Sequence, residues 1–263
     1  KVLIVGLGNI AGRYNEESKT SKSLTHAKAI KKNNFFSLEG CVDPDKERLD
    51  KFSDFWDVKK KYRCLEDITE FNYDLVVISS PSNLHAEHLL EINKRSPEVI
   101  FVEKPIALTY EDELKLKPLI DKKNICVNYL RNWDPRIKEF AKKINSYDQK
   151  GIFISKFNGS LMNSGSHMIS LLQEIFQQIN IVDINKYNQH DLITLESKNG
   201  AIISLIAIKS DLKYSVFEIS YMHKDGSMEM LCNGSDWLER EVISDKDFPS
   251  LKYLSSNSMH SSG

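Results

Sequence analysis

The first half of the chain alternates short apolar runs with longer segments whose apolar positions recur at helical spacing. This alternation is typical of βαβ units and predicts a parallel sheet covered by helices. We expect strands at residues 2–5, 37–42, 75–79, 99–102 and 125–129. We expect helices at residues 25–32, 44–52, 83–94 and 110–122, with Asn83 and Thr109 as N-caps and Pro44 in a first helical turn. Right-handed crossovers would place all strand ends at one edge.

The pattern changes after residue 129. Helices are expected at residues 135–143 and 167–176, followed by β-branched segments at 191–196, 201–208, 216–221 and 227–231. Asn199-Gly200 and Asp225-Gly226 lie between neighbouring segments, which is a strong hairpin signal. A mainly antiparallel sheet should therefore dominate the second half.

A glycine-rich turn, Gly6-Leu7-Gly8-Asn9-Ile10-Ala11-Gly12, directly follows the first strand. Glycines at this point allow a tight turn and a close approach of backbone amides to a pyrophosphate. The spacing is GxGxxxG, with Ala11 at the third small position of the stricter GxGxxG pattern, and an ordinary βα turn is the alternative. The turn predicts dinucleotide contacts from Gly6, Gly8, Asn9, Ile10 and Gly12.

These features predict an α/β protein with two domains. Residues 1–128 would form a Rossmann dinucleotide-binding domain, and residues 129–263 a C-terminal α+β domain for substrate binding and oligomerisation. The length of 263 residues favours two domains over one large domain.

Asp43 ends the second expected strand, where its carboxylate could accept hydrogen bonds from both adenosine ribose hydroxyls and repel a 2′-phosphate. We therefore expect NAD as cofactor, with NADP the less favoured alternative. Asp43 lies further from the glycines than usual, and an inserted loop over residues 13–24 would explain the excess. A capping or turn role before Pro44 is the other interpretation.

Ser80 and Pro81 directly follow the third expected strand, as Asp43 follows the second. They could pass beneath the nicotinamide ribose, although Pro81 could equally only turn the chain into a helix. His85 could reach the cofactor edge, or it could be solvated on that helix.

Glu103-Lys104-Pro105 follows the apolar run at residues 99–102 and sets an ammonium group at the carboxyl end of a strand. Open α/β sheets hold their ligands there. His167 follows later in the chain and could carry a proton near neutral pH. A cofactor turn, a cation and a proton carrier in this order indicate a nicotinamide-dependent oxidoreductase. The alternatives are a surface lysine in a turn and a capping or buried histidine.

Together these residues resemble the glucose-fructose oxidoreductase, inositol dehydrogenase and rhizopine-catabolism (Gfo/Idh/MocA) family over nearly the whole chain. The resemblance rests on the glycine turn, Asp43, Ser80-Pro81, Glu103-Lys104-Pro105, residues 163–167 and the β-rich second half. It implies that Lys104 helps to bind substrate and polarise the reacting hydroxyl, that Glu103 and Lys104 lie at the cofactor, and that Pro105 follows a cis peptide bond.

Many family members look like Asp-x-x-x-His where this chain has Asn163 and His167. The resemblance makes both candidate catalytic residues, but an asparagine cannot take a proton and could only orient the substrate or the ring. The segment 161–169 is similar to members of bacterial surface-sugar pathways, which implies a modified or nucleotide-linked sugar.

The resemblance implies hydride transfer between NAD(P) and a secondary hydroxyl of a sugar, nucleotide sugar or cyclitol. Two alternatives stay open: an NAD-dependent glycosidase that oxidises its sugar transiently, and a non-catalytic nucleotide-binding relative. The apolar segments 201–208 and 216–221 predict a homodimer or homotetramer formed through the second sheet.

Composition narrows the remaining classes. The formal net charge is −1, which argues against a nucleic-acid partner, and the lysines at 59–61 and 122–123 are expected on solvated helix or loop faces. The 4 cysteines show neither CxxC nor metal-ligand spacing, so we expect no metal and a reducing cytoplasm.

No apolar run approaches the length of a signal-peptide core or a membrane span, which predicts a soluble protein with no membrane partner. The chain begins at Lys1 and ends in a polar stretch, residues 255–263, that should not pack a core. One or both ends are therefore expected to be trimmed.

Overall fold

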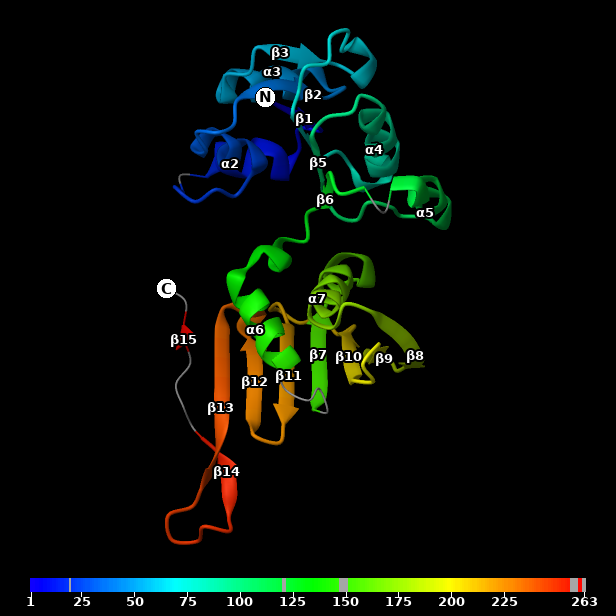
Figure 1. Ribbon diagram of the computed structural model, residues 1–263. Coiled ribbons are helices and arrows are strands. Elements are labelled where there is room, and N and C mark those ends of the chain that lie inside the picture. The colour runs from blue at the N-terminus through cyan, green and yellow to red at the C-terminus, as the bar shows by residue number, and fades with distance from the viewer. Residues whose placement is uncertain (19, 120–121, 147–150, 256–259, 262–263) are drawn as a thin grey trace. The chain divides into compact units, whose positions relative to one another are not determined.

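The structure, a computed structural model, describes residues 1–18, 20–119, 122–146, 151–255 and 260–261. The chain divides into two compact units, Lys1–Asn128 and Tyr129–Gly263 (Figure 1). The first unit has a six-stranded parallel sheet and the second a nine-stranded, mainly antiparallel sheet. The predicted fold class is confirmed.

The sheet of the first unit has the strand order β3-β2-β1-β4-β5-β6, the doubly wound order of a Rossmann fold. Its strands are β1 (Val2–Val5), β2 (Leu38–Val42), β3 (Lys60–Tyr62), β4 (Leu75–Ile78), β5 (Val99–Val102) and β6 (Ile125–Val127). Its α-helices are α1 (Tyr14–Glu17), α2 (His26–Lys32), α3 (Lys46–Trp56), α4 (His85–Lys94) and α5 (Tyr110–Leu116). A π-helix, Asn9–Arg13, follows the glycine turn, and short 3-10 helices cover Leu65–Asp67, Ser82–Leu84 and Lys117–Leu119.

The alternation of side chains along β1 builds two separate cores. Val2 and Ile4 lie in one buried cluster with side chains of α2 and α3. Leu3 and Val5 lie in another with side chains of α4 and α5. Because successive residues of a strand point to opposite faces, helices cover both faces and leave the strand ends at the edge for ligands.

Several predicted details of the first unit need correction. The lysines at 59–61 are exposed as predicted, but Lys60–Tyr62 is an edge strand and not a helix or loop, because exposed lysines also suit a strand with an open edge. Helix α3 begins at Lys46 with Asp45 as its N-cap, so Pro44 precedes the helix. Residues 13–24 contain α1 and are not a simple loop.

The two predicted caps have different outcomes. Thr109 caps α5 through a hydrogen bond from Asp112 N, which confirms that prediction. Asn83 caps nothing: it lies in a 3-10 turn, and α4 starts at His85 without a side-chain cap. Residues 120–121 of the helix predicted to end at 122 lie outside the described residues, and α5 itself ends at Leu116.

The sheet of the second unit has the order β14-β13-β12-β11-β7-β10-β9-β8, and β15 pairs with β13. Its strands are β7 (Ile152–Asn158), β8 (Ile179–Lys186), β9 (His190–Ser197), β10 (Ile202–Ile208), β11 (Phe217–His223), β12 (Gly226–Leu231), β13 (Asp236–Ser244), β14 (Lys252–Leu254) and β15 (His260–Ser261). Helices α6 (Pro135–Ser146) and α7 (Ser166–Phe176) pack on one face around a single core. A π-helix, Leu161–Gly165, leads into α7, and 3-10 helices cover Leu130–Trp133 and Cys232–Gly234.

Both predicted hairpins are confirmed. Asn199-Gly200 lies between the antiparallel strands β9 and β10, and Asp225-Gly226 connects β11 to β12. Strands β7, β8, β13 and β14 were not predicted. In β8, Asn, Asp and Lys side chains interrupt the isoleucines, and the strand is largely exposed at the sheet edge. The polar tail is not wholly without structure, since Ser255 is buried and accepts a hydrogen bond from Glu241 N; residues 256–259 and 262–263 lie outside the description.

Three further features concern a membrane span, a metal site and the cysteines. Within the described ranges, no helix is long and apolar enough to cross a bilayer. The same residues contain no group of histidine, cysteine, aspartate and glutamate side chains that could hold a metal ion. Cys41, Cys64, Cys126 and Cys232 are free thiols.

Candidate functional site

The glycine turn after β1 is shaped by two different requirements. Gly6 has φ +85°, and a Cβ on it would lie 2.3 Å from Ser80 Cα. At Gly8 a Cβ would meet nothing within 4 Å. Gly6 therefore permits close packing of the turn against the end of β4, whereas Gly8 leaves open space above the turn. Gly12 is buried, and a Cβ there would lie 2.5 Å from Trp56 Nε1, so this glycine allows α3 to pack closely.

Replacing Gly6 by alanine should lower the free energy of unfolding by about 3 kcal/mol, because strain and a backbone clash act together. The matched change Gly8→Ala should alter stability by no more than about 0.5 kcal/mol but weaken dinucleotide binding. Urea unfolding and NADH fluorescence titration measure the two effects. Equal stability losses at both positions would contradict this division of roles.

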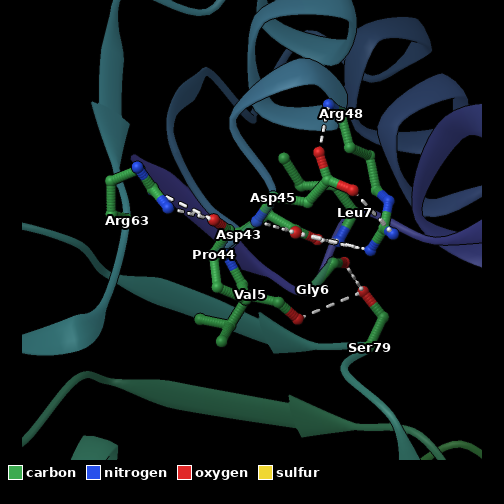
Figure 2. A network of polar contacts seen from close by, with 9 residues as sticks. All are labelled: Val5, Gly6, Leu7, Asp43, Pro44, Asp45, Arg48, Arg63 and Ser79. Carbon is green, nitrogen blue, oxygen red and sulfur yellow. Dashed lines mark hydrogen bonds and ion pairs between the residues drawn. The ribbon is translucent and has the colours of Figure 1, made fainter.

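Asp43 follows β2 and lies in a polar network beside the glycine turn (Figure 2). The residue is 2% exposed. Oδ2 accepts a hydrogen bond from Leu7 N at 2.9 Å, and Oδ1 accepts one from Asp45 N at 2.9 Å. Arg48, from α3, forms an ion pair with Asp43 at 3.2 Å while half of its side chain stays exposed. The carboxylate is thus held at the strand end by its own chain, with a guanidinium beside it.

A cavity of about 620 Å³ opens at the carboxyl ends of β1, β2 and β4. Its lining includes the predicted cofactor residues Gly6, Asp43, Ser80 and Pro81, together with Arg48 and Arg63. Arg63 is fixed by two hydrogen bonds to Pro44 O at 2.7 and 3.0 Å (Figure 2). A cavity of this volume is in the usual range for a small-molecule site.

Gly8 and Asn9 line a second cavity, of about 490 Å³, with Arg13, Arg48 and Lys51. The Ile10 side chain is exposed at the same turn. Glu16, Asp45 and Glu47 lie in the same lining and balance the basic side chains. The open space over the backbone of the glycine turn is therefore the feature that suits a pyrophosphate here.

His85 is placed differently from the expectation that it reaches the cofactor. It is 1% exposed, and neither described cavity includes it in its lining. Its Nδ1 lies 2.7 Å from Pro105 O and its Nε2 2.8 Å from Ser80 O. His88, on the same helix, lies with Nδ1 2.9 Å from Ser80 Oγ, and burial lowers the pKa of its ring.

Lys104 follows β5 in a turn whose Lys104-Pro105 peptide bond is cis, as the resemblance implied. Partial burial lowers the pKa of Lys104, although the neighbouring Glu103 opposes the shift. Glu103 Oε1 is 2.8 Å from His26 Nε2 and accepts a hydrogen bond from Asn128 Nδ2 at 2.7 Å. Burial alone would raise the pKa of Glu103, but these contacts outweigh it, so the pKa is lowered and the carboxylate stays ionised.

In the second unit, His167 is the second residue of α7 and is half-buried. Its ring meets that of Tyr129 edge to face at 5.6 Å between centroids. Burial raises the pKa of Tyr129. Asn163 is exposed in the preceding π-helix, whose N-terminal Ser160 accepts a hydrogen bond from Asn163 N. The π-helix and the start of α7 therefore hold Asn163 and His167 within one short segment.

Four residues of the first unit were missed by the sequence analysis: Arg48, Arg63, His26 and Asn128. Three of them, Arg63, His26 and Asn128, act from a distant point in the chain, as His26 does on Glu103 across 77 positions. Only Arg48, in the first turn of the helix after Asp43, carried a local signal. In the second unit, Arg131 hydrogen-bonds Asn233 and stacks on Phe217, which suits a packing role.

The first unit has the fold of an NAD(P)-binding Rossmann domain, with the candidate cofactor residues at its ligand edge. Residues 1–129 match the family model described as an oxidoreductase family with an NAD-binding Rossmann fold. The family whose model matches the first unit is the Gfo/Idh/MocA family, which is the family that the sequence resembles. A search of curated proteins found no match.

Solved structures share the fold over most of the chain. The WlbA dehydrogenase from Bordetella pertussis, in complex with NADH and UDP-GlcNAcA, is 17% identical with a TM-score of 0.71, covering 89% of this chain and 78% of that one. Myo-inositol 2-dehydrogenase from Lactobacillus plantarum is 18% identical with a TM-score of 0.66, covering 94% and 80%. A mutant of KijD10, a 3-ketoreductase from Actinomadura kijaniata, in complex with TDP-benzene and NADP, is 13% identical with a TM-score of 0.69, covering 96% and 82%.

Proposed function

We propose that this protein is an NAD(P)-dependent dehydrogenase or reductase that transfers a hydride between the cofactor and a secondary hydroxyl of a sugar, nucleotide sugar or cyclitol. The observation that carries the proposal is the cavity where Gly6, Asp43, Ser80 and Pro81 meet at the carboxyl ends of the parallel strands. That edge is the ligand edge of a doubly wound sheet. Two solved structures of the same fold support the substrate class: one binds the nucleotide sugar UDP-GlcNAcA, and the other, a 3-ketoreductase, binds the nucleotide TDP-benzene.

The chemistry requires a proton to leave the hydroxyl as hydride leaves the carbon. A bound nicotinamide would accept or supply the hydride. The Lys104 ammonium would stabilise negative charge on the reacting oxygen. His167 would take up or return the hydroxyl proton, and Asn163 would orient the substrate or the ring by hydrogen bonds.

The decisive experiment follows absorbance at the reduced-nicotinamide band while NAD or NADP and a panel of free and nucleotide-linked sugars and cyclitols are supplied. A substrate-dependent change in absorbance supports the proposal. Cleavage of a glycoside without net change in the cofactor would assign the glycosidase reaction instead. Tight dinucleotide binding without turnover across the panel would assign a non-catalytic binding role.

We propose NAD as the preferred cofactor, because a carboxylate at the end of β2 disfavours a 2′-phosphate. Asp43→Asn keeps the shape of the side chain and removes its charge, which also leaves Arg48 with Asp45 as its remaining ion-pair partner. The ratio of the Kd for NADPH to that for NADH should therefore fall at least about tenfold, a change typical of a charged contact. Adding Arg48→Ala should reverse the gain, since the guanidinium that would meet the phosphate is gone. Fluorescence titration measures both constants, and an unchanged ratio would contradict the assignment.

We propose a homodimer or homotetramer formed through the sheet face that α6 and α7 leave uncovered. Ile152, Ile202 and Met222 are exposed apolar side chains on this face. Ile152→Glu with Ile202→Glu should convert the oligomer to monomers, because each buried interface would enclose unpaired charges. Phe35→Glu, at a residue 94% exposed in the first unit, is the control that should leave assembly intact. Sedimentation that shows a monomeric unmodified protein at micromolar concentration would reject the proposal.

The four free thiols suit a reducing compartment, so we propose a cytoplasmic location.

A further inference from the structure

His85 is a buried polar side chain with no part in the proposed chemistry. It lies where two turns of the ligand edge come together, one after β4 and one after β5. Nε2 lies 2.8 Å from Ser80 O in the first turn, and Nδ1 lies 2.7 Å from Pro105 O in the second. One imidazole ring thus bridges the backbones of two turns.

Both atoms that the His85 ring contacts are backbone carbonyl oxygens. A backbone carbonyl oxygen accepts hydrogen bonds and donates none, so each contact requires an N–H from the ring. A neutral imidazole has one N–H and could satisfy one carbonyl group, whereas a ring with a proton on each nitrogen satisfies both. In a site this buried, a nitrogen lone pair facing a carbonyl oxygen would be repulsive.

The bridge connects the cofactor turn to the lysine turn. Ser80 is packed against Gly6, where no Cβ would fit, so the backbone that His85 holds on one side is also the support of the glycine turn. On the other side His85 holds Pro105, the residue after Lys104. Glu103, the residue before Lys104, is held by His26 and Asn128. The backbone of Lys104 is therefore fixed from both sides.

We propose that His85 is a positioning residue that fastens the Lys104 turn to the support of the cofactor turn by donating a hydrogen bond to each. The long side chain of a lysine reaches many places, and fixing its backbone restricts where the ammonium group can lie. A misplacement of about 1 Å in an active site can cost about a hundredfold in rate. The inference rests on the proposed function in giving Lys104 its catalytic role, but the contacts themselves do not depend on it.

The first test follows Lys104 directly and needs no substrate. Trace labelling with acetic anhydride over a pH series, read by mass spectrometry, gives the midpoint at which each lysine becomes reactive. In the unmodified protein the midpoint for Lys104 should lie below the ordinary value for lysine of about 10.4, because partial burial lowers the pKa of Lys104. In His85→Phe, which keeps a ring without N–H groups, the midpoint should rise toward the ordinary value for lysine of about 10.4 as the turn loosens into water.

The control is Leu89→Ala on the same helix. Leu89 is buried in the core of the first unit and has no hydrogen bond to either turn, so this variant destabilises α4 without releasing Lys104. The midpoint for Lys104 should stay where it is. A His85→Phe variant that is folded, binds NADH and keeps the midpoint of the unmodified protein would overturn the proposal, as would an equal shift in Leu89→Ala.

Histidine-selective ¹⁵N spectra of the unmodified protein give a second measurement, which is independent of the labelling. Both ring nitrogens of His85 should show a directly bonded proton, and the His85 signal is assigned by its loss in His85→Gln. A ring nitrogen without a proton could not donate a hydrogen bond to its turn, and this result would overturn the proposal.

Turnover separates this inference from the proposed function. If a substrate is found, His85→Phe should lower kcat about a hundredfold with KM for NADH nearly unchanged, and Leu89→Ala should retain kcat. Loss of turnover in Lys104→Met with normal turnover in His85→Phe would overturn this inference alone. Normal turnover in Lys104→Met would remove the lysine from the mechanism, while the labelling and the spectra would still decide whether His85 fastens the turns.

Discussion

Lys104→Met is expected to lower kcat about a thousandfold while the Kd for NADH changes by less than about threefold. The ammonium group would act on charge that develops on the substrate oxygen during hydride transfer, so its loss would raise the barrier far more than it weakens cofactor binding. Methionine keeps the length and apolar stem of the side chain, which limits the loss of packing. Stopped-flow absorbance at the reduced-nicotinamide band, with NADH fluorescence titration, measures the two quantities.

The pH profile provides an independent check on this role. Partial burial lowers the pKa of Lys104, so the ammonium form is lost at a lower pH than for an ordinary lysine. In the unmodified enzyme kcat should therefore fall as the pH rises through a value below about 10.4, and this alkaline limb should be missing from the residual activity of Lys104→Met. Lys115→Met, which removes an exposed lysine of α5, is the control. Normal turnover in Lys104→Met would remove the lysine from the mechanism.

The sequence predicted strands best where a continuous apolar run coincides with burial of the strand between two layers of helices. Val2–Val5 and Val99–Val102 are continuous apolar runs, as expected of strands buried between two helical layers, and both have the predicted bounds. Edge strands gave weaker signals. Lys60–Tyr62 pairs with a neighbour on one side only, so nothing requires an apolar sequence there.

In the site, too, short motifs were predicted from the sequence, whereas contacts between residues far apart in the chain were not. The strand end that carries Asp43 and the turn that carries Lys104 were both predicted from short motifs. The partners that set their electrostatics were not, because Leu7 and Asp43, or His85 and Pro105, meet only after the sheet has formed. His85 was assigned to the cofactor because its sequence position fits the ligand edge. The structure shows that its ring is buried and that its two nitrogens face the backbone oxygens of Ser80 and Pro105, which indicates the positioning role proposed above.

His167→Gln is expected to lower kcat between about a hundredfold and ten thousandfold, the usual range for loss of a general base. Glutamine can hydrogen-bond the substrate but cannot take its proton, so substrate binding should be largely retained. His167 belongs to the same helical segment as Asn163, and an asparagine at that position supplies no charge to an imidazolium. The whole proton transfer would thus depend on the ring, and Asn163→Ala should cost much less than His167→Gln.

A second histidine of the same unit gives the matched control. His190, at the start of β9, also contacts a tyrosine: it stacks on Tyr187 with ring centroids 4.9 Å apart, whereas His167 meets Tyr129 edge to face. His190→Gln should leave kcat within about twofold, since surface changes away from a site usually have small effects. Comparable losses from both substitutions would point to a disturbance of the second unit and not to proton transfer. Full activity in His167→Gln, with the fold intact, would require another residue as the base and would leave Lys104 as the remaining candidate for the proton.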